Sequence, residues 1–154
     1  MAVGVPVGWI SLHIAASIVT YAILTVAAVS AIAVFLQEHG LKSKRTPTTL
    51  NGMLPSVVDA ERLQIRLMIS AQIVLFIGLL SGMATQYFLT GDLLVFDHKV
   101  LLTLAAFLTI GSMIIVHFRS GLRGRIAARI ALVAYLLLTL GYPGVKFVTD
   151  VLLV

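Results

Sequence analysis

Four stretches of the sequence are apolar, free of proline and each close to the roughly 20 residues that a helix needs to cross a bilayer. They cover residues 9–36, 67–89, 100–118 and 126–142. In hydrocarbon a continuous helix satisfies its own backbone polar groups, and the alternating ten-residue pattern of a membrane barrel is absent from this sequence. The sequence therefore predicts an all-α polytopic membrane helix bundle with four transmembrane helices, formed as a single domain over residues 1–154. The apolar residues after Pro143 predict one more short C-terminal segment.

The composition is that of an integral membrane protein. Hydrophobic residues make up 60% of the chain and charged residues 11%, whereas about a quarter of a typical soluble domain is charged. The chain contains no cysteine, which excludes disulfides, thiolate metal sites and thiol catalysis. No motif of a hydrolase, metalloprotease or phosphate-binding loop occurs, so we expect no enzymatic activity.

The basic residues are distributed unevenly between the two ends of the predicted spans. The two connections that follow the first and third spans contain Lys42, Lys44, Arg45, Arg62, Arg66, Arg119, Arg123, Arg125 and Arg129. An excess of Lys and Arg marks the cytoplasmic side, so residues 37–66 are predicted to form a cytoplasmic loop, with both termini outside. The net charge of +5 therefore reflects orientation rather than nucleic-acid binding. Ser56 and Asp59 have the spacing of a capping box, which predicts a short surface helix that leads into the second span.

Ionisable residues inside or at the ends of spans are the first candidates for function. His13 lies about one turn inside the outer end of the first span, among apolar neighbours. An imidazole in that place needs a hydrogen-bond partner or a metal, since burying it unpaired costs a few kcal/mol. Two interpretations remain open: a histidine that is hydrogen-bonded to another helix, or an axial ligand of a membrane haem.

The third span begins with Asp97, His98 and Lys99. Asp97 is well placed to cap this helix, and Lys99 can extend toward the lipid headgroups. His98 is predicted to lie at the same depth as His13. Two imidazoles from facing helices at one depth would form a bis-histidine haem site or bind one small metal ion.

His117 lies at the inner end of the third span, 19 residues after His98. That separation is about 28 Å of helix, so one haem cannot join the two residues. Either His117 binds a second, inner haem, or it helps the basic stretch that follows to meet anionic headgroups.

Gly78 and Gly82 form a GxxxG pair in the second span, beside Ser81. Small residues at this spacing let another helix approach closely in lipid. The Ala- and Ser-rich first span suits such a neighbour. The contact is either packing within the bundle or a dimer interface.

The order and spacing of several motifs resemble the cytochrome c assembly family. The motifs are the "LH" that opens the first span, the "LPS" before the second span with an acidic residue and Arg after it, the Lys that opens the third span, and the closing "HFRSGLRGR". The chain is most similar to the carboxy-terminal core of the HemX/YpjD-like inner-membrane branch of that family. The likeness covers nearly the whole chain.

The resemblance implies that His13 is an outer-face haem ligand and that His117 is a ligand of a haem inside the membrane. Asp97 and Lys99 match the residues that follow the family's tryptophan-rich outer loop. The resemblance also implies haem b as the cofactor, the bacterial inner membrane as the location, and apocytochromes or haem-delivery proteins as partners. The tryptophan-rich loop and the family's second outer histidine are absent from this sequence. We therefore expect His98, in place of the missing second outer histidine, to pair with His13.

Three functions compete at this point. The first is a haem-handling membrane protein of the cytochrome c assembly type. The second is a cofactor-free accessory or regulatory subunit that binds other membrane proteins. The third is ion transport, which is weaker because the middles of the spans offer only Thr, Ser and Gln as polar side chains.

Overall fold

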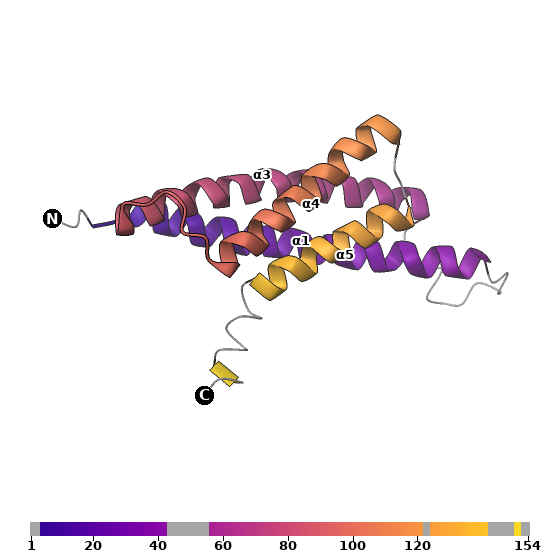
Figure 1. The fold of residues 1–154 in the computed structure, drawn as a ribbon. Coiled ribbons are helices and arrows are strands. Elements are labelled where there is room, and N and C mark those ends of the chain that lie inside the picture. Colours follow the sequence, from indigo (N-terminus) through magenta and orange to yellow (C-terminus); the bar gives the residue numbers. More distant parts are fainter. Residues whose placement is uncertain (1–3, 43–55, 122–123, 142–149, 152–154) are drawn as a thin grey trace.

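The computed structural model describes residues 4–42, 56–121, 124–141 and 150–151. The four main helices are α1 (Val7–Lys42), α3 (Val57–Thr90), α4 (His98–Ser120) and α5 (Arg125–Thr139). Every regular element in these residues is helical, as predicted (Figure 1). The predicted C-terminal apolar segment lies almost wholly outside the described residues.

The start of α3 confirms the capping box. The Ser56 hydroxyl accepts a hydrogen bond from the Asp59 backbone N–H at 3.2 Å and donates one to the Asp59 carboxylate at 2.6 Å. The expected separate surface helix is wrong, however, because α3 continues without a break for 34 residues. Neither glycine nor proline occurs between residues 57 and 77, so nothing interrupts the helix between the capped start and the span.

The boundaries of α4 also follow from local chemistry. The Asp97 carboxylate accepts a hydrogen bond from the His98 N–H at 2.7 Å, which confirms the expected cap. The helix ends at Gly121, whose φ of 64° is left-handed and whose N–H donates to the His117 carbonyl at 2.9 Å. Glycine is favoured there because it adopts positive φ at no steric cost.

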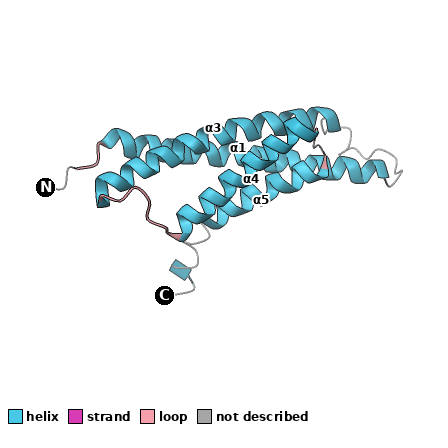
Figure 2. Ribbon diagram, turned by 45° about the horizontal axis from the view of Figure 1, so that its top comes forward, coloured by secondary structure: helices cyan, strands magenta, loops and turns pink. Residues whose placement is uncertain are grey.

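Helices α1 and α3 lie side by side over much of their length in both ribbon views (Figures 1 and 2). Helix α5 packs against α1 and α4, and α4 makes a smaller contact with α3. The carboxyl end of α4 stands away from the other helices in Figure 1. The two ends of α4 therefore have different surroundings.

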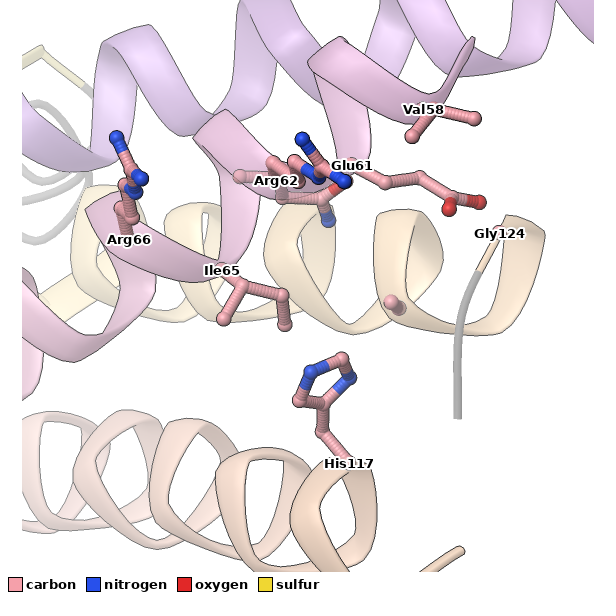
Figure 3. A pocket seen from close by; sticks show the side chains of 9 residues that line it. Val58, Glu61, Arg62, Ile65, Arg66, His117 and Gly124 are labelled. Atoms are coloured by element: carbon pink, nitrogen blue, oxygen red, sulfur yellow. The ribbon is translucent and has the colours of Figure 1, made fainter. Parts of the chain in front are cut away.

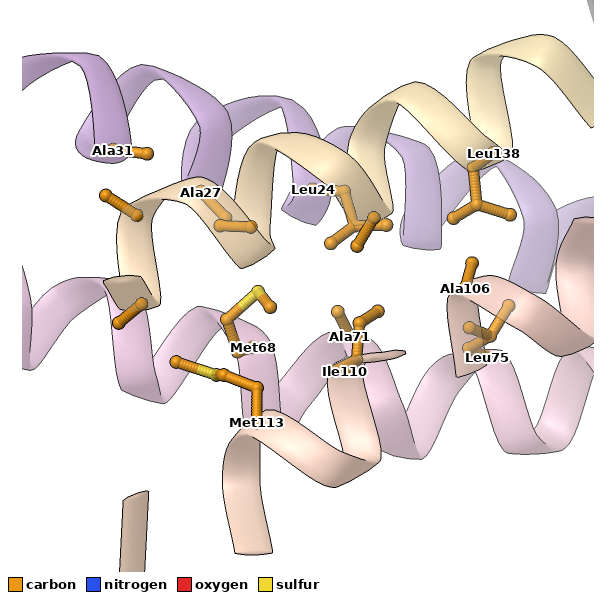
Figure 4. Close-up of a cluster of buried hydrophobic side chains, with 14 of the residues drawn as sticks. Leu24, Ala27, Ala31, Met68, Ala71, Leu75, Ala106, Ile110, Met113 and Leu138 are labelled. Atoms are coloured by element: carbon orange, nitrogen blue, oxygen red, sulfur yellow. The ribbon is translucent and has the colours of Figure 1, made fainter. Parts of the chain in front are cut away.

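The core is built largely from alanine. Fully buried alanines come from all four helices, namely Ala27, Ala31, Ala71, Ala106, Ala128, Ala131 and Ala134. Larger side chains, among them Leu24, Met68 and Met113, lie between the helices (Figure 4). In lipid, small residues bring helix backbones close enough for dispersion contacts and polar contacts to hold them together.

Three helical segments in the described part of the chain are long and apolar enough to cross a membrane: residues 7–40, 57–90 and 98–120. The predicted fourth span, 126–142, coincides with α5. This helix has 15 residues and rises about 22 Å, less than the roughly 30 Å of a hydrocarbon core. Residue 142 lies outside the described residues. The fourth crossing and the positions of the termini therefore stay predictions.

The absence of cysteine allows a direct test of orientation. Asp92, after α3, and Arg119, in the last turn of α4, are both exposed. We expect a membrane-impermeant maleimide to label Asp92→Cys in intact cells, because the distribution of Lys and Arg predicts that this end faces outward. Arg119→Cys should be labelled only after the membrane is permeabilised. The wild-type chain serves as the blank, and the opposite labelling pattern would reverse the predicted topology.

Candidate functional site

His13 lies on the face of α1 that packs against α3. Its Nδ1 is 3.0 Å from the Gly78 carbonyl oxygen and 3.3 Å from the Ser81 hydroxyl. A carbonyl only accepts, so Nδ1 must carry the proton that it donates. The lone pair of the imidazole is then on Nε2, which has no hydrogen-bond partner in the described residues. This tautomer is the one that a backbone carbonyl sets in metal-binding histidines.

The two glycines of the GxxxG pair make room for α1. A Cβ atom at Gly82 would lie 3.0 Å from Cε1 of His13, and one at Gly78 would lie 3.6 Å from the Ala16 Cβ. Ser81 is buried, and its hydroxyl donates to the Gly78 carbonyl at 2.9 Å. The predicted close approach is therefore confirmed. The face formed by Gly78 and Gly82 packs against α1 of the same chain. The sequence did not reveal that this face also holds the His13 ring.

His98 lies in a different setting. Its Nδ1 is 2.5 Å from Asp97 Oδ1, and its side chain is 55% exposed. Helix α1 packs chiefly on α3 and α5, whereas α4 packs on α5 and α3. In the described structure no hydrogen bond, ion pair or ring contact joins His98 to His13. Their pairing around a metal stays a prediction.

His117 lies in the last turn of α4, at the end of the helix opposite His98. Its ring packs edge-on against Phe118, with 5.5 Å between the ring centroids. It also lines a pocket of about 250 Å³ between α3, α4 and α5 (Figure 3). The other lining residues are Val58, Glu61, Arg62, Gln64, Ile65, Arg66, Gly124 and Ala127.

Sequence reasoning missed this pocket. It used Arg62 and Arg66 only to assign orientation, and it did not single out Gln64. The one available signal was a glutamine among the charged residues at the amino end of α3. Among the described residues, no group of three or more His, Cys, Asp or Glu side chains is arranged to hold a metal ion.

The long apolar helices indicate a multi-pass helical membrane protein. Its candidate histidines lie at a helix–helix contact and at helix ends. Residues 7–153 match the family described as "Cytochrome C assembly protein". The chain therefore belongs to the cytochrome c assembly protein family, and the resemblance inferred from the motifs is confirmed at that level. At the family level, membership connects the chain with haem.

The chain is also similar to a curated relative from Azospirillum brasilense, an "Uncharacterized 28.8 kDa protein in nifR3-like 5'region". The two are 58% identical over 150 residues, which is 97% of this chain and 55% of the relative. The chain thus spans about half the length of the relative that it matches. No solved structure matches the chain.

Proposed function

We propose that this protein is a haem-handling membrane protein of the cytochrome c assembly kind, with His13 as a ligand of haem b. The observation that carries the proposal is the hydrogen bond from His13 Nδ1 to the Gly78 carbonyl, 3.0 Å long. It orients the ring and leaves the Nε2 lone pair for iron. An imidazole held in this way by a backbone carbonyl is the usual arrangement of a metal-ligating histidine.

His98 is the proposed second ligand. Its contact with Asp97 repeats the arrangement at His13, because a carboxylate beside Nδ1 also leaves Nε2 for a metal. An exposed ring at the start of α4 is accessible to a ligand that lies at the membrane surface. When bound, the haem iron would supply redox and axial-ligand chemistry, and the two histidines would hold the group in place and set its coordination.

His117 remains the candidate ligand of a separate inner haem. It lies too far along α4 from His98 to share one haem, about 28 Å by helical rise. A second axial ligand for such a haem would have to come from outside the residues that line the His117 pocket, because no other lining residue is a histidine.

The proposed role is to hold haem and pass it on, without bond-making chemistry of its own. The proposed partners are apocytochromes or haem-delivery proteins, together with other membrane subunits, and the proposed location is the bacterial inner membrane. Within the family we propose that the chain lies in the HemX/YpjD-like branch, on the order and spacing of the "LH", "LPS" and "HFRSGLRGR" motifs and of the Lys that opens the third span.

A cofactor-free accessory subunit is the second candidate. One observation favours it: the His13 ring already has a hydrogen-bond partner on α3 and fills the space beside Gly82. A histidine that only joins two helices would look the same at Nδ1. The two candidates differ in whether iron binds Nε2.

An absorption spectrum of the purified protein separates them. After expression with a supply of haem, we expect about one haem per chain with the Soret band of a low-spin, six-coordinate iron. A purified protein that is folded but contains no haem would favour the function of a cofactor-free accessory subunit.

A further inference from the structure

The loop between α3 and α4 contains a continuous apolar segment, residues 93–96, with the sequence Leu-Leu-Val-Phe. All four side chains are exposed, from 40% at Leu94 to 74% at Phe96. The two residues that flank the segment, Asp92 and Asp97, are exposed as well. A single exposed apolar side chain is ordinary, whereas a contiguous exposed group marks an interaction surface. Residues 93–96 are therefore a candidate contact with an apolar partner.

The backbone of this segment, unlike its side chains, needs water. Residues 91–97 form neither helix nor strand and are drawn in pink between α3 and α4 (Figure 2). In the described structure, the backbone N–H groups of residues 93–96 donate no hydrogen bond. Unpaired backbone groups are costly in hydrocarbon. The headgroup layer of a bilayer meets both needs, because it is hydrated and borders the acyl chains.

The length of α4 places the segment near that layer. Residues 100–118 contain no Asp, Glu, Lys or Arg and rise about 28 Å, close to the roughly 30 Å of a hydrocarbon core. Lys99 therefore lies at one surface of the core when α4 crosses it. Phe96 comes three residues earlier, so its Cα lies at most about 10 Å from that of Lys99. Since each headgroup layer is on the order of 5–8 Å thick, Phe96 lies in it or beside it.

Two aromatic residues on other helices indicate the same level. Trp9 lies in the first turn of α1 and Tyr87 in the last turn of α3, and they are 39% and 51% exposed. The contact of His13 with Gly78 brings these two helix ends to the same end of the bundle (Figure 1). Exposed Trp and Tyr side chains are enriched where a membrane meets water. Their positions support an interface at the level of the loop without reference to α4.

We propose that residues 93–96 insert their side chains into the headgroup layer and anchor the start of α4 at the membrane surface. The partner is the lipid surface itself. The carboxylates of Asp92 and Asp97 stay in water on either side of the inserted segment. The contact needs no particular headgroup, because the inserted side chains are apolar and the flanking charges are negative. The proposal is independent of haem and holds equally for a cofactor-free subunit.

The first experiment measures the depth of the loop. The chain has no cysteine, so one nitroxide spin label can be attached at Phe96→Cys or, as the matched control, at Asp92→Cys. Each labelled protein is reconstituted into phosphatidylcholine vesicles. Accessibility of the label to oxygen, which concentrates in lipid, is then compared with accessibility to a water-soluble nickel chelate.

We expect the ratio of oxygen to nickel accessibility to be severalfold higher at position 96 than at position 92. An equal or lower ratio at position 96 would overturn the proposal, because the segment would then lie in water. Low accessibility of position 96 to both reagents would also overturn it, since protein or a bound cofactor would then cover the segment.

The second experiment tests the anchor with the label at Leu93→Cys. Adding Phe96→Ser should raise nickel accessibility at position 93 severalfold, because the segment loses its most exposed apolar side chain. Val7→Ser is the matched control, since Val7 is 78% exposed at the start of α1 and lies outside the loop. Both substitutions are at exposed positions, so the thermal midpoint in detergent should not change. Unchanged accessibility with Phe96→Ser, or an equal rise with both substitutions, would contradict the anchor.

Discussion

His13→Ala is expected to abolish the low-spin haem spectrum of the purified protein. The substitution removes the imidazole that the Gly78 carbonyl orients at the α1–α3 contact, and with it the proposed iron ligand. Haem content and the Soret band should be measured at equal protein concentration. Loss of a residue that only supports a metal ligand usually lowers the affinity about 10–100-fold. Loss of the ligand itself should lower the affinity for haem by more than that.

Three further variants make this result specific. His98→Ala should convert the spectrum to a five-coordinate form with reduced haem content. Ser81→Ala should give a smaller loss, up to about tenfold, because its hydroxyl lies 3.3 Å from Nδ1 and only supports the ring. His39→Ala, near the carboxyl end of α1, should leave the spectrum unchanged. Retention of the wild-type spectrum in both His13→Ala and His98→Ala would refute the proposed ligand pair.

Gly82→Val is expected to destabilise the protein by about 1–3 kcal/mol, the usual cost of overpacking a contact. Even the first added carbon would lie 3.0 Å from the His13 ring. The ring cannot retreat freely, because it is held by its hydrogen bond to Gly78. Thermal unfolding in detergent measures the change, and in the haem-loaded protein the spectrum should change as well.

Gly8→Val is the matched control for this substitution. Gly8 lies in the first turn of α1, and a Cβ there meets nothing within 4 Å. We expect a change within about 0.5 kcal/mol, as for most exposed substitutions. If the two variants unfolded at the same temperature, the close approach of α1 to α3 at Gly82 would not be part of the stable fold.

Much of the local structure was predictable from the sequence. The apolar segments, the cap at Ser56 and the cap at Asp97 depend on residues that are neighbours along the chain. The family motifs also depend on order and spacing alone, and the match over residues 7–153 confirmed the family that they indicated. The separate surface helix before the second span was wrong, because a capping signal marks where a helix begins and does not show where it ends.

The surroundings of the candidate residues were not predictable in the same way. His13 meets Gly78 across 65 positions of sequence, and the pocket joins residues 58–66 to His117 and to residues 124–127. Neither the His13–Gly78 contact nor the pocket can be recognised from the residues of a single segment. His98, by contrast, has a partner next to it in the chain, and that contact could be anticipated from the sequence.

By itself the sequence determined that this chain forms long helices in a membrane, because apolar segments in lipid must satisfy their own backbone hydrogen bonds whatever lies beside them. Only the tertiary structure decided which helices touch and what each histidine faces. Lipid is as apolar as leucine, so it gives helices no hydrophobic reason to prefer one partner. The choice depends on small contacts such as those of Gly78 and Gly82 with α1, which exist only once the helices are packed.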